Sequence, residues 1–304
     1  MIRYKNHKEI DKQKWDLCIQ RSVNGIIYGY SWYLDIVAPG WEALVEEDYE
    51  SVMPLVCRRK FGMHYLYQPF FTQQLGVFSS NKFTEEKIKE FIASIPSKFS
   101  FLEINLNTFN KFSSMDVIIH PNLTHELDLI ESYEKIRSAY SENLQRNLKR
   151  ASSFELTIDK QISPKLIINL FRHNKGKQFE NIGQSEYTML NDLIDASLAK
   201  GRAQVWGVMT KEKRLCAGAF FLESNGKVIF LFSGSNQIAR TNGAIPFLLD
   251  RFIHANAQLN LTFDFEGSND LNLARFYKSF GSKECVYLQV KVNRLPWYAR
   301  FFKD

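Results

Sequence analysis

Two carboxylates and one lysine lie close together in the segment LTFDFEGSNDLNLARFYKSFG, which spans residues 261–281. A carboxylate such as Asp264 or Glu266 can accept a proton from an attacking amine, directly or through water. The ammonium group of Lys278 can stabilise an oxyanion or a phosphate. The segment can therefore support proton transfer and the stabilisation of negative charge, and we take Asp264, Glu266 and Lys278 as candidate catalytic residues.

The pattern of this segment predicts a strand and a helix that position these groups. Residues 261–266 alternate between apolar and polar side chains, which is the period of a β-strand with unlike faces. Gly267 ends the strand, residues 268–270 offer N-cap oxygens, and Gly281 follows the helix as its C′ residue. Such a unit directs the three candidates towards a strand end, where α/β sheets usually hold ligands. The alternative is that all three lie on solvated faces.

The same segment resembles the end of the C-terminal domain of FemAB/FemX-like proteins, which are peptidoglycan aminoacyltransferases and their relatives in the GNAT acyltransferase superfamily. The resemblance is carried by Phe263-Asp264-Phe265-Glu266-Gly267 and by Phe276-Tyr277-Lys278-Ser279-Phe280-Gly281. It implies that Lys278 takes part in the transfer chemistry. On the same helix we take Arg275 and Tyr277 as candidate substrate-binding residues, with the core as the alternative place for Tyr277.

The most basic part of the chain, residues 132–151, is predicted to form one helix. Arg146, Lys149 and Arg150 are spaced i, i+3 and i+4, so we expect them to share one face and to hold an anion together. FemAB-like chains carry a similar basic helix between their two domains. The resemblance therefore favours substrate binding by these residues over a solvated charged face.

The two halves of the chain show the same order of predicted elements. Three pairs of segments correspond at a nearly constant offset: 41–45 with 205–208, 51–56 with 215–220, and 65–67 with 228–230. The expected fold is α/β with mixed sheets and two tandem GNAT-like domains, as the resemblance also implies. The first domain is expected to span residues 1–150 and to end in the basic helix, and the second to span 151–304.

A donor site is expected after the predicted strand at residues 227–234. The resemblance implies a thioester carbonyl polarised by a backbone N–H and a CoA pyrophosphate seated on the amides that open the next helix. The sequence Arg240-Thr-Asn-Gly-Ala-Ile245 departs from the usual (Q/R)-x-x-G-x-(G/A), because a β-branched residue replaces a small one. Gly243 is also explained by helix entry alone. The candidate cofactor-binding residues are Ser233, Gly234, Ser235, Arg240, Asn242 and Gly243.

This departure leaves two classes of donor open. One is an acyl-CoA, and the other is an aminoacyl-tRNA, which FemX-like enzymes use in the absence of a standard CoA site. Either donor is a substrate, so no permanently bound cofactor is expected. The acceptor is expected to carry an amine, and a cell-wall precursor is one candidate.

Composition and charge limit the class of protein. A hydrophobic content of 45% with 24% charged residues is globular, and a net charge of +6 favours an anionic partner. The cysteines and histidines lack metal-ligand spacing, so no metal site is expected. The first fifteen residues hold no apolar run, which predicts a cytoplasmic protein. The oligomeric state stays open.

The last twelve residues, 293–304, interleave aromatic and basic side chains. Such a segment is suited to peripheral contact with a membrane interface, and the alternative is a terminal segment packed on the fold.

Neither a Ser-His-Asp nor a Cys-His set is discernible in the sequence, which disfavours a covalent acyl-enzyme.

The sequence thus predicts an N-acyltransferase of the GNAT/FemAB-like type that transfers an acyl or aminoacyl group to an amine. One alternative is a non-catalytic GNAT-like binding protein whose donor site has degenerated. Another is a nucleic-acid-binding module that uses the basic residues 146–150.

Overall fold

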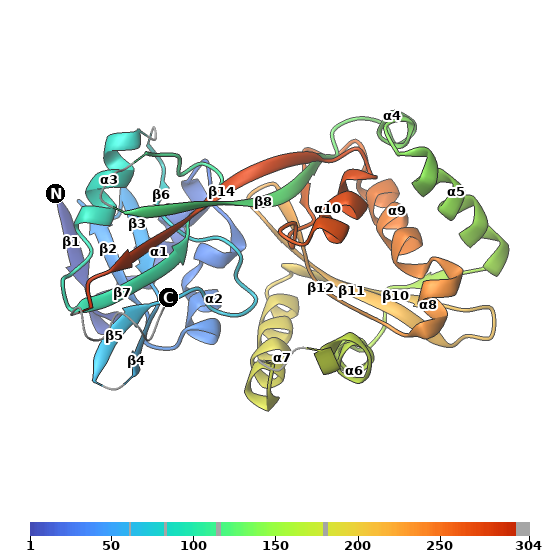
Figure 1. The fold of residues 1–304 in the computed structure, drawn as a ribbon, viewed down its shortest axis with the longest axis horizontal. Helices are drawn as coiled ribbons and strands as arrows, with labels where there is room; N and C mark the ends of the chain where they lie inside the picture. Colours follow the sequence, from blue (N-terminus) through green and yellow to red (C-terminus); the bar gives the residue numbers. More distant parts are fainter. Residues whose placement is uncertain (61, 82–83, 114–116, 179–181, 296–304) are drawn as a thin grey trace. The chain divides into compact units, whose positions relative to one another are not determined.

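The computed structural model describes residues 1–60, 62–81, 84–113, 117–178 and 182–295. The chain divides into two compact units, Met1–Asn122 with Val286–Asp304, and Leu123–Cys285 (Figure 1). This division differs from the expected join near residue 150, and it places the basic segment in the second unit. A pattern-based prediction follows chain order, so it does not foresee that the last strand returns to the first unit.

The first unit contains a four-stranded antiparallel sheet with the order β1-β2-β3-β6. The predicted hairpin in residues 41–58 is confirmed, because β2 and β3 pair antiparallel around the turn at residues 47–50. The strands are β1 (Ile2–Lys5), β2 (Glu42–Glu46), β3 (Ser51–Leu55) and β6 (Phe78–Ser79).

Further strands of this unit follow the order β4-β5-β7-β14. Their apolar faces and helix α3 enclose a core that includes Phe91, Phe99 and Val290. Thr84 caps α3 by accepting a hydrogen bond from the amide of Lys87, as predicted. The elements are β4 (Cys57–Lys60), β5 (Met63–Leu66), β7 (Phe99–Asn105), β14 (Lys283–Asn293), α1 (Lys12–Arg21), α2 (Ser31–Val37) and α3 (Glu85–Ala93).

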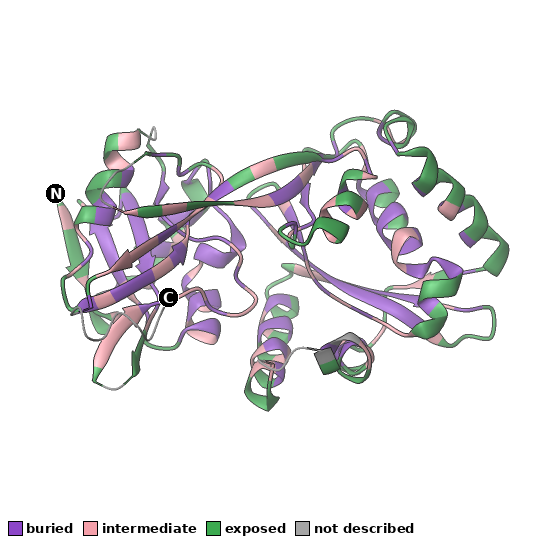
Figure 2. Cartoon of the chain, in the orientation of Figure 1, coloured by how far each residue is buried: buried purple, intermediate pink, exposed green. Residues whose placement is uncertain are grey.

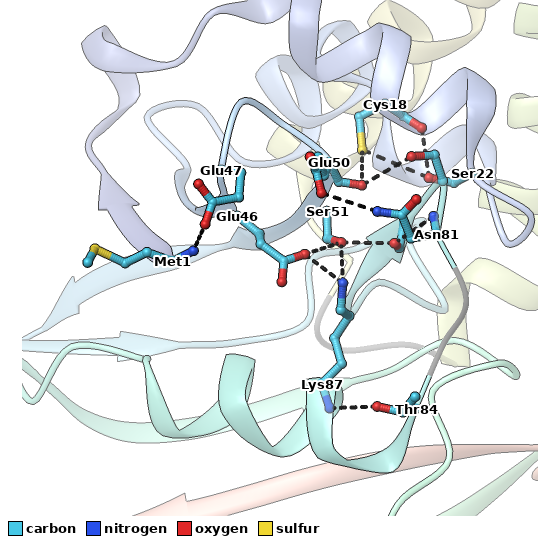
Figure 3. Close-up of polar contacts among 12 residues, drawn as sticks. Met1, Cys18, Ser22, Glu46, Glu47, Glu50, Ser51, Asn81, Thr84 and Lys87 are labelled. Atoms are coloured by element: carbon cyan, nitrogen blue, oxygen red, sulfur yellow. Dashed lines mark hydrogen bonds and ion pairs between the residues drawn. The ribbon is translucent and has the colours of Figure 1, made fainter.

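A polar network joins α3 to β2 and β3 inside the first unit (Figure 3). The ammonium of Lys87 lies 2.6 Å from a carboxylate oxygen of Glu46 and donates to the hydroxyl of Ser51 at 3.2 Å. Ser51 donates to Glu46 at 2.6 Å, and its hydroxyl lies 2.8 Å from that of the buried Ser79. Each charge in this network therefore has a partner, which is the condition for burying charged groups without a large loss of stability.

The second unit is built on a sheet with the order β8-β13-β12-β11-β10-β9. Neighbouring strands are antiparallel except β12 and β13, which are parallel. The predicted strands in residues 203–209, 214–223 and 227–234 are confirmed. The strands are β8 (Ile118–Asp128), β9 (Thr157–Asp159), β10 (Ala203–Met209), β11 (Leu215–Ser224), β12 (Lys227–Ser235) and β13 (Thr262–Asp264).

Helices cover both faces of this sheet, with α6 and α7 on one side and α5, α9 and α10 on the other (Figure 1). An aromatic core under α9 contains Trp206, Phe221, Phe252, Phe263 and Phe265. The outer helix α5 is largely exposed (Figure 2). The helices are α4 (Tyr133–Ser138), α5 (Glu142–Ala151), α6 (Pro164–His173), α7 (Gln184–Ala199), α8 (Gln237–Asn242), α9 (Ala244–Asn256) and α10 (Leu271–Lys278).

The single helix predicted for residues 132–151 is wrong, because the chain forms two helices there, α4 and α5. The hydroxyl of Ser141 accepts a hydrogen bond from the amide of Leu144, so Ser141 begins a new helix as its N-cap. The amide of Ser141 donates to the carbonyl of Ser279, which draws the chain towards the end of α10. The first helix ends at Ser138 and Ser141 begins the next one, a role that the position of Ser141 in a polar run does not reveal.

The internal correspondence holds for two of the three segment pairs. Each half contains an antiparallel hairpin, β2 with β3 and β10 with β11. The third pair differs, because β12 pairs with β11 whereas β5 pairs with β4 and β7.

The predicted mixed α/β fold class is confirmed. Among the residues that the structure describes, none of the helices combines the length and apolar character needed to cross a bilayer.

Candidate functional site

Asp264, a candidate catalytic base, lies at the end of β13 and is fully buried. Its Oδ1 accepts hydrogen bonds from the hydroxyl of Thr124 at 2.5 Å and from the amide of Glu266 at 3.0 Å. Its Oδ2 lies 3.6 Å from the ammonium of Lys227 and has no hydrogen-bond partner. Asp264 therefore holds the turn that follows β13 rather than facing solvent.

Lys227 joins two carboxylates in one buried network. Its ammonium donates to Glu126 at 2.5 Å and faces Asp264. Burial raises the pKa of Asp264, and the positive charge of Lys227 opposes that effect. Burial also disfavours the charged form of Lys227, but Asp264 and Glu126 outweigh it and hold its pKa above the ordinary value. Sequence reasoning missed Lys227 and Glu126, because no local signal shows which strands will be neighbours.

The turn after Asp264 presents Glu266 in a fixed backbone conformation, with φ values of 55° at Glu266 and 54° at Gly267. The hydroxyl of Ser268 donates to the carbonyl of Glu266 at 2.9 Å. That hydroxyl also lies 2.9 Å from Nδ1 of His125. Because a hydroxyl has one proton, Nδ1 of His125 is the donor in this second contact. Burial lowers the pKa of His125, Glu284 opposes this effect, and Lys278 adds to it.

Helix α10 places its predicted residues in two environments. Lys278 and Arg275 are exposed. Tyr277 is buried and stacks on Phe265 with ring centroids 5.0 Å apart, and burial raises its pKa. Tyr277 therefore belongs to the core, which was the alternative to substrate binding. The charge of Lys278 contributes to the lowered pKa of His125, whose ring lies 2.9 Å from the hydroxyl of Ser268 in the turn.

A cavity of about 230 Å³ brings residues of the two predicted binding groups together. Arg150 of α5 lines it with Ser235, Arg240 and Gly243, and we call it the Arg150–Arg240 cavity. Gly243 joins α8 to α9 with a φ of 71°, a conformation that glycine adopts without strain. Both arginines are exposed, and neither forms an ion pair among the described residues. The cavity thus offers two guanidinium groups beside the first turn of α9, an arrangement suited to phosphate.

Two of the other donor candidates have structural roles. Gly234 pairs with Gly218 on β11, and a Cβ at position 234 would lie 2.3 Å from the carbonyl oxygen of Ile167 on α6. Close packing of a helix on the sheet therefore requires glycine there. Asn242 is buried at the end of α8, and its side-chain oxygen accepts a hydrogen bond from the amide of Ala244, the first residue of α9. Ser233 lies on β12 and does not line the cavity.

Arg146 and Lys149 line a second and larger cavity of about 1020 Å³. Arg150 does not line it, so the three basic residues expected to share one anion divide between two cavities. The Arg150–Arg240 cavity is lined by none of the candidate catalytic residues. Among the described side chains, no group of three or more His, Cys, Asp or Glu is placed to hold a metal ion.

Solved structures share this fold across nearly the whole chain. FemX has a TM-score of 0.66 at 12% identity and covers 95% of this chain and 98% of its own. The C-terminal domain of an Agrobacterium fabrum protein described as a lysylphosphatidylglycerol synthetase has a TM-score of 0.57 at 11% identity, covering 96% and 94%. L-PGS from Bacillus licheniformis has a TM-score of 0.53 at 10% identity, covering 94% and 92%.

These likenesses establish the fold and confirm, at that level, the resemblance that the motif indicated. No family model matches the chain, and no curated protein matches it in sequence. The chain therefore has a FemX-like fold.

Proposed function

We propose that this protein is an N-acyltransferase of the GNAT/FemAB-like type, with two tandem GNAT-like domains and a cytoplasmic site of action. It transfers an acyl or aminoacyl group from an activated donor to an amine, and a cell-wall precursor is one candidate acceptor. The observation that carries the proposal is the Arg150–Arg240 cavity, which gathers two arginines without ion-pair partners in the described part of the chain, beside the first turn of α9 in a FemX-like fold.

The chemistry of this cavity favours a donor held by side chains. Ile245 lines the cavity with an apolar side chain, and Pro246 has no amide proton to offer. A pyrophosphate would therefore find fewer backbone donors here than at an ordinary helix start. The guanidinium groups of Arg150 and Arg240 supply the missing N–H groups. This arrangement suits either an acyl-CoA or an aminoacyl-tRNA as the acyl donor, with no permanently bound cofactor.

We assign the transfer step to the turn after β13 and to α10. The amine nitrogen attacks the donor carbonyl, and the bond from that carbonyl to sulfur or oxygen breaks. Glu266 accepts the proton that the amine loses, and the proton passes on to the leaving group. Lys278 stabilises the oxyanion of the tetrahedral intermediate, and Arg275 binds the anionic part of a substrate. Asp264 positions Glu266 through its hydrogen bond to the Glu266 amide.

Replacement of Lys278 by Ala tests the assignment. The variant is expected to lose on the order of a hundredfold or more in turnover and to keep the wild-type unfolding temperature, because the side chain is exposed. Lys135→Ala is the matched control, since Lys135 is an exposed lysine on α4 that pairs with Glu131. Equal turnover in the two variants would remove Lys278 from the mechanism.

The alternative is a non-catalytic GNAT-like binding protein. The observation that favours it is Ile245, an apolar β-branched residue that lines the donor cavity. A binding protein would bind the donor without transferring the acyl group to any amine. Binding of a donor with no turnover across a panel of amines would decide for this alternative.

The predicted membrane contact rests mainly on residues 296–304, which lie outside the described residues.

A further inference from the structure

The larger cavity, lined by parts of α4, α5, β9 and α9, has no place in the proposed transfer step. Its volume of about 1020 Å³ lies at the upper end of the range for small-molecule sites. It and the Arg150–Arg240 cavity have no lining residue in common. We call it the α5–α9 cavity.

Four cations from three helices line the α5–α9 cavity: Arg137 of α4, Arg146 and Lys149 of α5, and Arg251 of α9. None of the four forms an ion pair or a side-chain hydrogen bond among the described residues. Two of them lie over aromatic rings instead, Arg137 near Tyr133 at 5.9 Å and Arg251 near Phe247 at 5.3 Å. Such stacking orients a guanidinium and leaves its N–H groups available.

The carboxylates of the α5–α9 cavity do not neutralise these cations. Glu155 is paired with Lys211 at 2.6 Å. Asp250 is buried and accepts a hydrogen bond from the hydroxyl of Tyr133 at 2.8 Å. Burial and this contact with Asp250 raise the pKa of Tyr133 to about 12. The four cations thus face three carboxylates, Glu142, Asp250 and Glu155, and Glu155 is already paired with Lys211, so the cavity keeps an excess of positive charge.

We propose that the α5–α9 cavity binds a compact ligand that carries two or more phosphate groups. One phosphate cannot satisfy four cations that come from three helices, whereas two or three linked phosphates can. Arg146 and Lys149 lie about one turn apart on α5 and so reach adjacent phosphates. Arginines give phosphate bidentate hydrogen bonds, and three of the four cations are arginines. This ligand is separate from the acyl donor, so the proposal does not depend on the proposed function.

The source of the phosphates is either a nucleoside diphosphate or free pyrophosphate, and titration calorimetry on the full chain separates them. Arg150→Ala/Arg240→Ala is the starting protein, because it removes the cations of the other cavity. We expect pyrophosphate or ADP to bind it at one site per chain. ADP binding tighter than pyrophosphate assigns a nucleotide, equal affinity assigns the diphosphate alone, and adenosine is expected not to bind.

Arg146→Ala/Lys149→Ala, added to the starting protein, is expected to weaken that binding by about tenfold or more. Arg137→Ala tests the same cavity from α4, and Lys135→Ala on the same helix is the matched control, with unchanged affinity expected. The altered side chains are exposed, so circular dichroism and the unfolding temperature are expected to stay constant. Loss of affinity in Lys135→Ala equal to that in Arg137→Ala would overturn the proposal.

Two further results would also overturn the proposal. One is binding of neither pyrophosphate nor ADP to the starting protein. The other is binding of a short RNA duplex that depends on Arg146 and Lys149 while pyrophosphate and ADP fail to bind, which would make the surface a nucleic-acid site instead.

Discussion

The network around Lys87 in the first unit and the basic face of α5 in the second unit use positive charge in opposite ways. Lys87 is matched by Glu46 and Ser51 inside the fold (Figure 3). Arg146 and Arg150 have no ion-pair partner among the described residues, and each lines a cavity. Matched charges inside the fold hold elements together, whereas unmatched charges around a cavity serve a ligand. By this criterion Asp264, which faces Lys227, belongs with the matched charges.

Lys227→Met gives the largest expected effect on stability. The substitution leaves the carboxylate of the fully buried Asp264 without its cation. We expect a loss of about 3–5 kcal/mol in the free energy of unfolding, measured by denaturant titration. Addition of Asp264→Asn to Lys227→Met is expected to restore part of the loss, because the amide needs no counter-charge. An additive double-mutant cycle would contradict the coupling.

Gly234→Ala tests whether glycine in the predicted donor segment serves packing. A Cβ there would meet the carbonyl oxygen of Ile167 at 2.3 Å. We expect a loss of about 1–3 kcal/mol in the free energy of unfolding, with Ser235→Ala on the same strand close to neutral. If Gly234→Ala keeps full stability and loses donor binding, Gly234 belongs to the donor site after all.

Lys87→Met tests the matched network of the first unit. Glu46 keeps its hydrogen bond from Ser51 after the change, so the loss is smaller than for Lys227. We expect about 1–2 kcal/mol in the free energy of unfolding. Lys89→Met, on the same helix and paired with the more exposed Glu85, is the control with no measurable loss. An equal loss in both would show that the network adds nothing beyond a surface pair.

The pH dependence of stability tests the environment of Asp264. Burial raises its folded pKa above the unfolded value of about 3.9. The folded state therefore binds the proton of Asp264 more tightly than the unfolded state does. The stability that this proton contributes is fully present below the unfolded pKa and is lost as pH rises through the folded pKa. In denaturant titrations carried out from pH 4 upwards, the free energy of unfolding of Asp264→Asn is expected to lack the part of the decline with pH that Asp264 causes. An unchanged pH profile would contradict the raised pKa.

The smallest effect on stability is expected for Arg146→Ala/Lys149→Ala. These side chains are exposed and have no ion-pair partner among the described residues. The free energy of unfolding is expected to change by no more than about 0.5 kcal/mol per substitution. A loss as large as that of Lys87→Met would mean that these charges are matched within the fold and would remove the contrast between the two regions.

The local signals in the sequence predicted much of the fold. The hairpin in residues 41–58 follows from alternating apolar runs around a polar turn, and α10 follows from its Asp270 cap, whereas Gly281 lies one residue beyond the C′ position predicted for it. The break at Ser141 was missed, because a serine in a polar run signals equally a helix interior and a cap. Asp264 was expected at a strand end open to ligand, but β13 lies between β8 and β12 and its end is buried.

The candidate site was also only partly predictable, because local sequence patterns do not show which elements become neighbours in the fold. The candidates Arg150, Arg240 and Gly243 lie together in one cavity, although Arg150 is far from the other two in the sequence. Helical spacing placed Arg146 and Arg150 on one face of α5. Because α5 packs against α9, however, the two residues line different cavities. Lys227 was missed because its partners, Glu126 and Asp264, come from strands whose neighbours are set by the tertiary fold.

Donor binding to the Arg150–Arg240 cavity is the central claim, and a thermal-shift comparison of donors tests it most directly. The purified protein and its Arg150→Ala/Arg240→Ala variant would be heated with acyl-CoAs and with charged and uncharged tRNA. We predict that acyl-CoA or charged tRNA raises the unfolding temperature of the unaltered protein, and that the variant loses most of this shift. An equal shift in both proteins, or no shift with any donor, would contradict the account.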